Sequence, residues 1–266
     1  MTFGIESSNI VGYTAKEAAQ GKFIILGAQF EGIASGAVKI NEVITGLQGV
    51  DVDIEDFTHE KTAPQIQIPT AAGYDIYYYV NDGYYDTGAV DGDGEPIYDQ
   101  KPGWVDGYGM ITEDEITPGV AVWLKSVPGD AMVNVAGAVP SVDSAEVSCP
   151  AGFALRSNIF PIATPLNGGS MLAVGIKGVD VDIEDFTHEK TAPQIQIPTA
   201  AGYDIYYYVN DGYYDTGAVD GDGEPIYDQK PGWVDGYGMI AEDTISAAQG
   251  FWTKGVSSAF TLKFVK

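Results

Sequence analysis

The chain has 266 residues, the length of one large or two ordinary domains, and 45% of them are hydrophobic. Thirty-eight acidic residues stand against thirteen basic ones, which gives a formal net charge of -25. A charge of this sign repels phosphate backbones and anionic lipid, so we expect neither nucleic acid nor a membrane surface as a partner. The longest apolar runs, such as FIILG at 23–27, are too short to span a bilayer, and no membrane insertion is expected.

A long repeat organises the sequence. Residues 49–111 recur at 178–240 with an offset of 129, and all 63 positions are identical. Each copy carries thirteen acids, two lysines and eight tyrosines, so most of the charge and most of the tyrosines lie inside the copies. The flanks correspond more loosely, with Trp123 matching Trp252 and Phe23 matching Phe153. The duplicated unit is therefore a module of about 130 residues, a normal domain size.

We divide the chain into an N-terminal tail at 1–9, a first module at 10–139 and a second module at 140–266, joined by the connector GAVPSVDS. The start MTFGIESSN has neither the basic nor the apolar part of a secretion signal, so we expect a cytosolic chain or a leader that has been removed. The single cysteine, Cys149, rules out a disulfide within one chain.

The predicted elements are almost all strands. NIVGYT at 9–14 is extended, and GVDVDIED at 49–56 alternates, which places Val50, Val52 and Ile54 on one face of a strand. PQIQIPT at 64–70 alternates again. YDIYYYVNDGYYDTG at 74–88 predicts a hairpin that turns at Asn81-Asp82-Gly83. The capping-box spacing in TEDEIT at 112–117 predicts about one helical turn.

Closing strands are predicted at AVWLKS (121–126) and AMVNVAGAV (131–139), and at GFWTKG (250–255) and FTLKFVK (260–266) in the second module. We expect Trp123 and Trp252 in these strands to lie in the core, and Trp104 and Trp233 to lie in turns between glycines. Short strands with regular turns and no long helix predict an all-β fold. We expect two tandem β-sandwich, Ig-like modules related by the 129-residue internal repeat.

The passage PGWVDGYGMITEDEITPGVAVWLKS at 102–126 resembles a module of uncharacterised secreted bacterial tandem β-sandwich repeat proteins. LRSNIFPIATPLNGG at 155–169 is similar to their first strand, whereas Ala247-Ala248 departs from the Pro-Gly pair at 118–119. The resemblance implies secretion and β structure, and it implies no chemistry. We therefore expect an extracellular or cell-surface location.

The acidic stretch DGDGEPIYD, present at 91–99 and 220–228, suggests calcium because its carboxylates are hard oxygen ligands at close spacing. It is not an EF-hand, because prolines stand at the sixth and twelfth positions of that loop. A solvated acidic turn explains the same residues. The candidate calcium ligands are Asp91, Asp93, Glu95, Asp99, Asp220, Asp222, Glu224 and Asp228.

The tyrosine-rich hairpin suggests an aromatic surface. Tyr74, Ile76, Tyr78 and Val80 share one face of the first strand, and one of its two faces should be core. The other face would bind sugars or another protein, or would stabilise the hairpin across its strands. The predicted surface residues are Tyr77, Tyr79, Tyr84, Tyr85, Trp104, Tyr206, Tyr208, Tyr213, Tyr214 and Trp233.

Signals of catalysis are absent from the sequence. It contains no nucleophile elbow, no phosphate loop and no cysteine–histidine pair, and its lone histidines, His59 and His188, have no second ligand near them to suggest zinc. We therefore expect no enzyme, with a glycan-active enzyme as the least favoured hypothesis, since carboxylate pairs can be drawn from the 38 acids.

The two ends of the chain suggest self-assembly. The strand TLKFVK at 261–266 stops where the first module continues into the connector, and NIVGYT of another molecule could dock beside it. Head-to-tail addition of this kind builds open filaments. The favoured function is thus a structural subunit of an extracellular filament or surface layer, a homopolymer. The alternative is a calcium-assisted adhesin that binds glycans. The predicted assembly residues are Ile10, Val11, Tyr13, Leu262 and Phe264.

Overall fold

The computed structural model describes residues 11–30, 37–70, 72–247, 249–256 and 258–266. The chain is all-β: its described residues form strands joined by turns, with three helices of four residues each. It divides into two compact units, Met1–Ser141 and Val142–Lys266, and the division falls inside the predicted connector. Each unit is described by itself.

The first unit contains a three-stranded sheet, a five-stranded sheet and a small two-stranded sheet, with strand orders β1-β10-β4, β2-β9-β5-β6-β7 and β3-β8. Its strands are β1 Val11–Ala18, β2 Phe23–Gly27, β3 Val38–Lys39, β4 Ile44–Thr45, β5 Gln65–Thr70, β6 Gly73–Val90, β7 Pro96–Val105, β8 Glu115–Ile116, β9 Ala121–Lys125 and β10 Ala131–Ala138. Its helices are α1 Ile40–Val43 and α2 His59–Thr62.

The second unit has the corresponding orders β11-β20-β14, β12-β19-β15-β16-β17 and β13-β18. Its strands are β11 Ser144–Cys149, β12 Gly152–Ser157, β13 Thr164–Pro165, β14 Met171–Val174, β15 Gln194–Thr199, β16 Gly202–Val219, β17 Pro225–Val234, β18 Thr244–Ile245, β19 Gly250–Gly255 and β20 Phe260–Val265, and its helix is α3 His188–Thr191. All of the strand pairs in both units are antiparallel.

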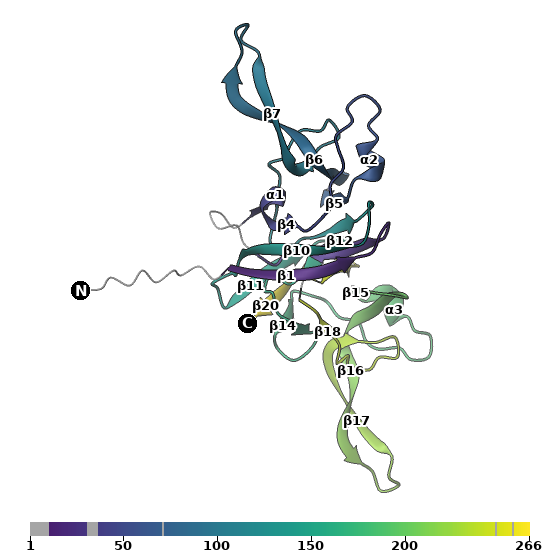
Figure 1. Ribbon diagram of the computed structural model, residues 1–266. Coiled ribbons are helices and arrows are strands. Elements are labelled where there is room, and N and C mark those ends of the chain that lie inside the picture. The colour runs from purple at the N-terminus through teal and green to yellow at the C-terminus, as the bar shows by residue number, and fades with distance from the viewer. Residues whose placement is uncertain (1–10, 31–36, 71, 248, 257) are drawn as a thin grey trace, which may run out of the picture. The chain divides into compact units, whose positions relative to one another are not determined.

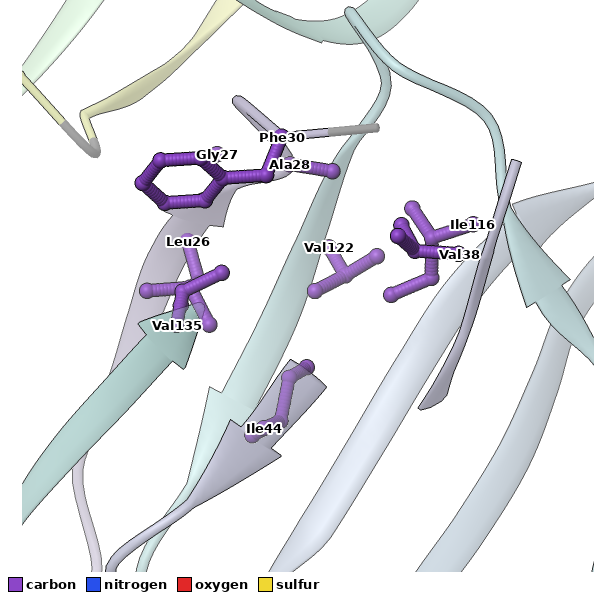
Figure 2. Close-up of a pocket in the computed structure, with 9 residues that line it drawn as sticks. All are labelled: Leu26, Gly27, Ala28, Phe30, Val38, Ile44, Ile116, Val122 and Val135. Carbon is purple, nitrogen blue, oxygen red and sulfur yellow. The ribbon is translucent and has the colours of Figure 1, made fainter. Parts of the chain in front are cut away.

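Each unit buries its core between its two larger sheets, as a β-sandwich does. In the first unit Val133 and Val135 of the three-stranded sheet pack in one cluster with Leu26, Val122 and Leu124 of the five-stranded sheet. Figure 2 shows Leu26, Val122 and Val135 of this cluster among the apolar side chains that line a small residual gap. The gap measures about 10 Å³, which is no more than one water needs. The gap is therefore core packing and offers no room for a ligand.

The repeated hairpin is longer than the alternation predicts, and its turn lies elsewhere. β6 continues through Asn81-Asp82-Gly83, where the pairing with β7 shifts register, and the chain turns at 91–95. The predicted turn at 81–83 is therefore wrong. A Cβ at Gly83 would lie 2.5 Å from Val105 Cγ1, so this glycine permits close packing at an irregularity. In Figure 1 each long hairpin extends as a two-stranded ribbon beyond its own sheet.

Two other local predictions are also wrong. Residues 49–53 form no strand: Val50 makes one isolated bridge to Val80, and the side chains of Asn81 and Asp82 bond to Asp51 and to the Val52 N–H. The segment TEDEIT contains the short strand β8 in place of a helical turn. At 49–53 side chains of β6 supply these hydrogen bonds, and at 112–114 the partners are Asn41 of α1 and the backbone of Ile40 and Trp104. In both places distant groups take the hydrogen bonds that a local element would have used.

The assembly prediction required a free edge on the last strand, and no such edge exists. β20 lies between β11 and β14, with Leu262 opposite Val147 on one side and Ala173 on the other. Leu262 and Phe264 are fully buried in the core of the second unit. The unit's own first strand already occupies the edge assigned to another molecule, so docking at β20 is ruled out.

In the first unit the corresponding strand, β10, pairs with β1 in the same way. Val11 begins β1, Tyr13 on that strand is exposed, and Ile10 lies outside the described residues.

Candidate aromatic binding site

The predicted aromatic surface is largely core. Trp104 is 0% exposed and Trp233 is 1% exposed, and Tyr77 and Tyr206 are also buried, so these four predictions are wrong. Tyr79 and Tyr208 are half-buried, with ring centroids 5.3 and 5.2 Å from the two tryptophans. Alternation in the sequence assigns the side chains to the two faces of the strand correctly. The face of Tyr77 and Tyr79 points into the sandwich, where both side chains pack in one core cluster with Trp104.

The remaining predicted surface tyrosines lie at the base of the ribbons and are half-buried. Tyr85 stacks under the Lys101 ammonium at 4.6 Å, and Tyr214 stacks under Lys230 at 4.4 Å. Tyr84 and Tyr213 take part in the ladders with β7 and β17. These residues stabilise the ribbon across its two strands, which is one of the explanations that the sequence left open.

The predicted calcium ligands hold a turn. Oδ1 of Asp91 accepts the N–H groups of Asp93 and Glu95 at 2.9 and 3.0 Å, and Asp220 does the same in the second copy. Oδ1 of Asp99 and of Asp228 accepts the N–H of the following glutamine. Within the described ranges no three acidic, histidine or cysteine side chains form a group that could hold a metal ion. Calcium binding stays a prediction of the sequence.

The two histidines are fully buried and fasten a loop. Nδ1 of His59 lies 3.0 Å from the carbonyl oxygen of Asp53, and Nδ1 of His188 lies 3.1 Å from that of Asp182. Asp53 in turn accepts hydrogen bonds from the backbone of Glu55 and Asp56 and from the Thr58 hydroxyl, which lower the pKa of its carboxyl group. Each histidine therefore stabilises the loop before α2 or α3.

A set of exposed aromatic residues lies instead on the outer face of each five-stranded sheet. In the first unit Phe23 on β2 is 44% exposed, Tyr74 on β6 is 44% exposed and Trp123 on β9 is half-buried. Gln67 on β5 pairs with Trp123 on one side and with Ile76 on the other, so these side chains share one face. We call Phe23, Gln67, Tyr74 and Trp123 the aromatic corner of this unit.

The second unit has the same arrangement on the same strands. Its aromatic corner consists of Phe153, Gln196, Tyr203 and Trp252. Phe153 and Tyr203 are 57% and 43% exposed, and Trp252 is half-buried. The prediction that Trp123 and Trp252 belong to the core is thus wrong, since both lie on the face that points away from the sandwich.

The two aromatic rings at the base of each corner meet at a right angle. The centroids of Phe23 and Trp123 are 6.0 Å apart with an interplanar angle of 80°, and those of Phe153 and Trp252 are 6.1 Å apart at 88°. The Lys125 ammonium lies 5.4 Å from the Phe23 ring, and Lys254 lies 5.4 Å from Phe153. The edge-to-face contact and the cation–ring contact hold the two rings in a defined geometry. These rings lie on the outer face and do not contribute to the core.

In the first unit the corner encloses a hollow. Phe23, Gln67, Tyr74 and Trp123 line an open depression of about 210 Å³. Pockets for drug-sized ligands span about 300–1,000 Å³, so this hollow is smaller and shallower than such a pocket. The lining combines aromatic rings with one amide, which can both donate and accept hydrogen bonds.

The phenylalanine and the tryptophan of each corner are shared where the two modules otherwise differ, whereas Gln67 and Tyr74 lie in the identical block. Between 112–135 and 241–264 six of the 24 positions are identical, namely the pairs Glu113/Glu242, Asp114/Asp243, Ile116/Ile245, Trp123/Trp252, Lys125/Lys254 and Val127/Val256. Ile116 and Ile245 serve the cores, whereas the tryptophan and lysine lie on the outer face. Along Phe23–Gly27 and Phe153–Ser157 the phenylalanine alone is shared. The shared phenylalanine and tryptophan thus lie outside the cores, on the outer face of each five-stranded sheet.

The sequence contains a pattern that places this tryptophan on the surface. In AVWLK the tryptophan and the lysine are two residues apart, so they lie on the same face of a strand. A lysine on a strand face marks that face as solvent-facing, which places Trp123 outside the core.

Comparison with protein-family models, with curated proteins and with solved structures found no match to this chain. None of the helices in the described part of the chain is long and apolar enough to cross a membrane. Interpretation of the site therefore depends on its geometry.

Proposed function

We propose that the chain binds carbohydrate through its two aromatic corners. The observation that carries this proposal is the shared right-angled pair of an exposed phenylalanine and a half-buried tryptophan, Phe23 with Trp123 and Phe153 with Trp252, on otherwise divergent strands. The corner belongs to the glycan-binding alternative drawn from the sequence, but it uses different residues and no calcium.

The chemistry of the corner suits a sugar ring. A pyranose has a face of C–H groups that packs against the electron-rich face of an aromatic ring. Its hydroxyl groups need donors and acceptors, and the Gln67 or Gln196 amide at the floor of the corner supplies both. The exposed aromatic area offers burial, and the amide offers orientation, which is how small-molecule sites divide these tasks.

Two corners in one chain favour polymers over single sugars. A polysaccharide presents many equivalent sites, so the second corner binds at a high effective concentration once the first is occupied. We therefore expect the chain to bind a polysaccharide more tightly than it binds short oligosaccharides of the same composition.

Affinity electrophoresis and calorimetry with a panel of polysaccharides test the proposal. The variant carrying Phe23→Ala and Trp123→Ala should lose one site, and adding Phe153→Ala and Trp252→Ala should abolish binding. Loss of one site should weaken binding to the polymer by at least about tenfold, because avidity is lost with it. Binding should be unchanged when calcium is removed with a chelator.

Tyr98→Ala with Tyr227→Ala is the matched control, since these tyrosines are 51% exposed but lie on the ribbons. Binding that survives the fourfold corner variant, or that disappears in the ribbon control, would contradict the proposal.

A second candidate function, a structural subunit of an extracellular filament or surface layer, is favoured by the ribbons. β7 and β17 end their sheets with no strand beyond them in the sheet order of the described residues. The ribbons also expose Val90, Ile97 and Tyr98, and the same residues of the second copy. A two-stranded ribbon is marginally stable in water, so pairing with another molecule would stabilise it. Either function fits an extracellular or cell-surface location.

A further inference from the structure

The shape and charge of the aromatic corner narrow the class of carbohydrate, and this inference rests on the proposed function. We propose that each corner takes one internal sugar ring of a neutral, soluble polysaccharide chain, and that it does not bind flat crystalline polymer surfaces or polyanionic glycans.

The angle between the rings decides against a flat ligand. A crystalline polymer face is planar, so several aromatic rings can lie flat on it together only if the rings share one plane. The interplanar angles of 80° and 88° leave only one ring of each pair able to lie flat on such a face. A single sugar ring can instead contact both aromatic rings at once, one with its face and the other with its edge.

The width of the corner suits one ring. Trp123 lies on β9 and Tyr74 on β6, and β5 with Gln67 runs between them. Neighbouring strands are about 4.8 Å apart, so the two walls are roughly 10 Å apart at the backbone, before their side chains narrow the space. The hollow is open to solvent, so the sugars on either side of the bound ring can leave it. The site is thus suited to an internal residue of a chain.

The charge around the corner disfavours anionic sugars. The repeated block that contributes Gln67 and Tyr74 carries thirteen acids and two lysines, and the whole chain has a formal net charge of -25. The cation of the corner, Lys125, lies over the Phe23 ring. Uronate-rich or sulfated chains would be repelled by the field of the block, so neutral chains are expected.

The test compares soluble neutral, soluble anionic and crystalline polymers with the same protein preparation. Soluble β-glucan, xylan and mannan are the neutral probes, alginate and polygalacturonate are the anionic probes, and crystalline cellulose and chitin are the flat probes. We expect at least one neutral soluble chain to retard the intact protein in affinity gels. The Trp123→Ala, Trp252→Ala variant should bind that chain at least about tenfold more weakly, as loss of an aromatic anchor does.

A second pair of variants tests the role of shape. Phe23→Leu with Phe153→Leu keeps an apolar side chain but removes one of the two rings that meet at a right angle, and it should also reduce binding to the soluble chain. Circular dichroism and the midpoint of thermal unfolding show whether each variant is folded, and the exposed position of Phe23 predicts that it is.

Each outcome decides a different point. Binding to crystalline polymers alone, or equal binding to crystalline and soluble ones, would overturn this inference while supporting carbohydrate binding. Preference for the anionic chains would overturn it as well. Absence of binding to every probe would contradict the proposed function itself, and the inference with it.

Discussion

At the scale of single residues, each half of the chain places one tyrosine in a polar contact inside the sandwich. The Tyr77 hydroxyl donates to Oδ2 of Asp114 at 2.6 Å, and Thr112 Oγ1 donates to the same oxygen. Burial and the Asp114 carboxylate raise the pKa of Tyr77, and burial together with Asp243 raises that of Tyr206. The free energy of unfolding of both halves should therefore fall at alkaline pH, where these two hydroxyl groups ionise more readily in the unfolded chain.

Replacing both tyrosines should change stability in a pH-dependent way. Tyr77→Phe with Tyr206→Phe should cost about 1 kcal/mol at each site at pH 7, the usual worth of a buried hydrogen bond. Because the folded pKa lies above the unfolded value of about 10, the tyrosines stabilise the fold fully below pH 10 and this contribution is lost as pH rises further. Urea unfolding at pH 7 and pH 11 should show a smaller alkaline loss in the variant. An identical loss in both proteins would contradict the assignment, and Tyr98→Phe is the exposed control.

The assignment of tyrosines to the two faces of β6 could be predicted from the sequence. Alternation divided Tyr77 and Tyr79 from Tyr74 and Ile76 correctly, because that division follows from strand geometry alone. The inward face could not be told from alternation, since both faces are aromatic. The choice is made by Trp104, which stacks on Tyr79 from a strand 25 positions along the chain.

At the scale of elements, one asparagine joins three segments in each half. Asn41 in α1 accepts the Trp104 N–H at 2.6 Å and donates to the carbonyl oxygens of Trp104 and Thr112. Asn167 makes the same three contacts to Trp233 and Ala241. A Cβ at Gly103 would lie 2.6 Å from Asn41 Oδ1, so the glycine before the tryptophan leaves room for this bridge.

Removal of the bridge should loosen the base of the ribbon. Asn41→Ala leaves the Trp104 N–H and the Thr112 carbonyl without this partner, whereas the Trp104 carbonyl keeps the Thr112 N–H. A buried unsatisfied group costs about 1–3 kcal/mol. We expect the first half to unfold at lower urea concentration and the amide of Trp104 to exchange hydrogen faster. Gln48→Ala, at an exposed site, should leave both unchanged. Unaltered exchange at Trp104 in the Asn41 variant would show that the bridge is dispensable.

The elements show why part of the fold escaped prediction. The strands β5, β9, β10, β19 and β20 were expected from their alternation, and they are present. The hairpin turn was misplaced because Asn-Asp-Gly is a common turn sequence, whereas here Asn81 and Asp82 bond to residues 51 and 52. Such long-range partners outweigh a local preference, and one sequence does not reveal them.

At the scale of the whole molecule, the structural-subunit proposal predicts that copies of the chain associate. The structural-subunit proposal now depends on the ribbon edges, since β20 is paired on both sides. Ile97→Lys with Ile226→Lys places a charge beside each free edge, which opposes edge pairing. Electron microscopy and light scattering of the wild-type chain should show polymers that this variant lacks. The fourfold corner variant should still polymerise. Monomers of uniform size for the wild-type chain at every ionic strength would sink this proposal.

The identical block supplies three of the five strands in each large sheet, and strands β9 and β19 from the variable flanks complete the contact with it. A newly synthesised polypeptide therefore holds two identical hairpins, and each of them could pair with the variable strands of either module. Such mispairing is a known hazard of neighbouring similar domains. The variable strands differ in the side chains that they bury: Val122 and Leu124 face the core from β9, whereas Phe251 and Thr253 do so from β19. A hairpin paired with the wrong module would meet core side chains of different volume, and this mismatch would destabilise the exchanged fold. Divergence outside the block therefore protects correct folding while the block itself stays invariant.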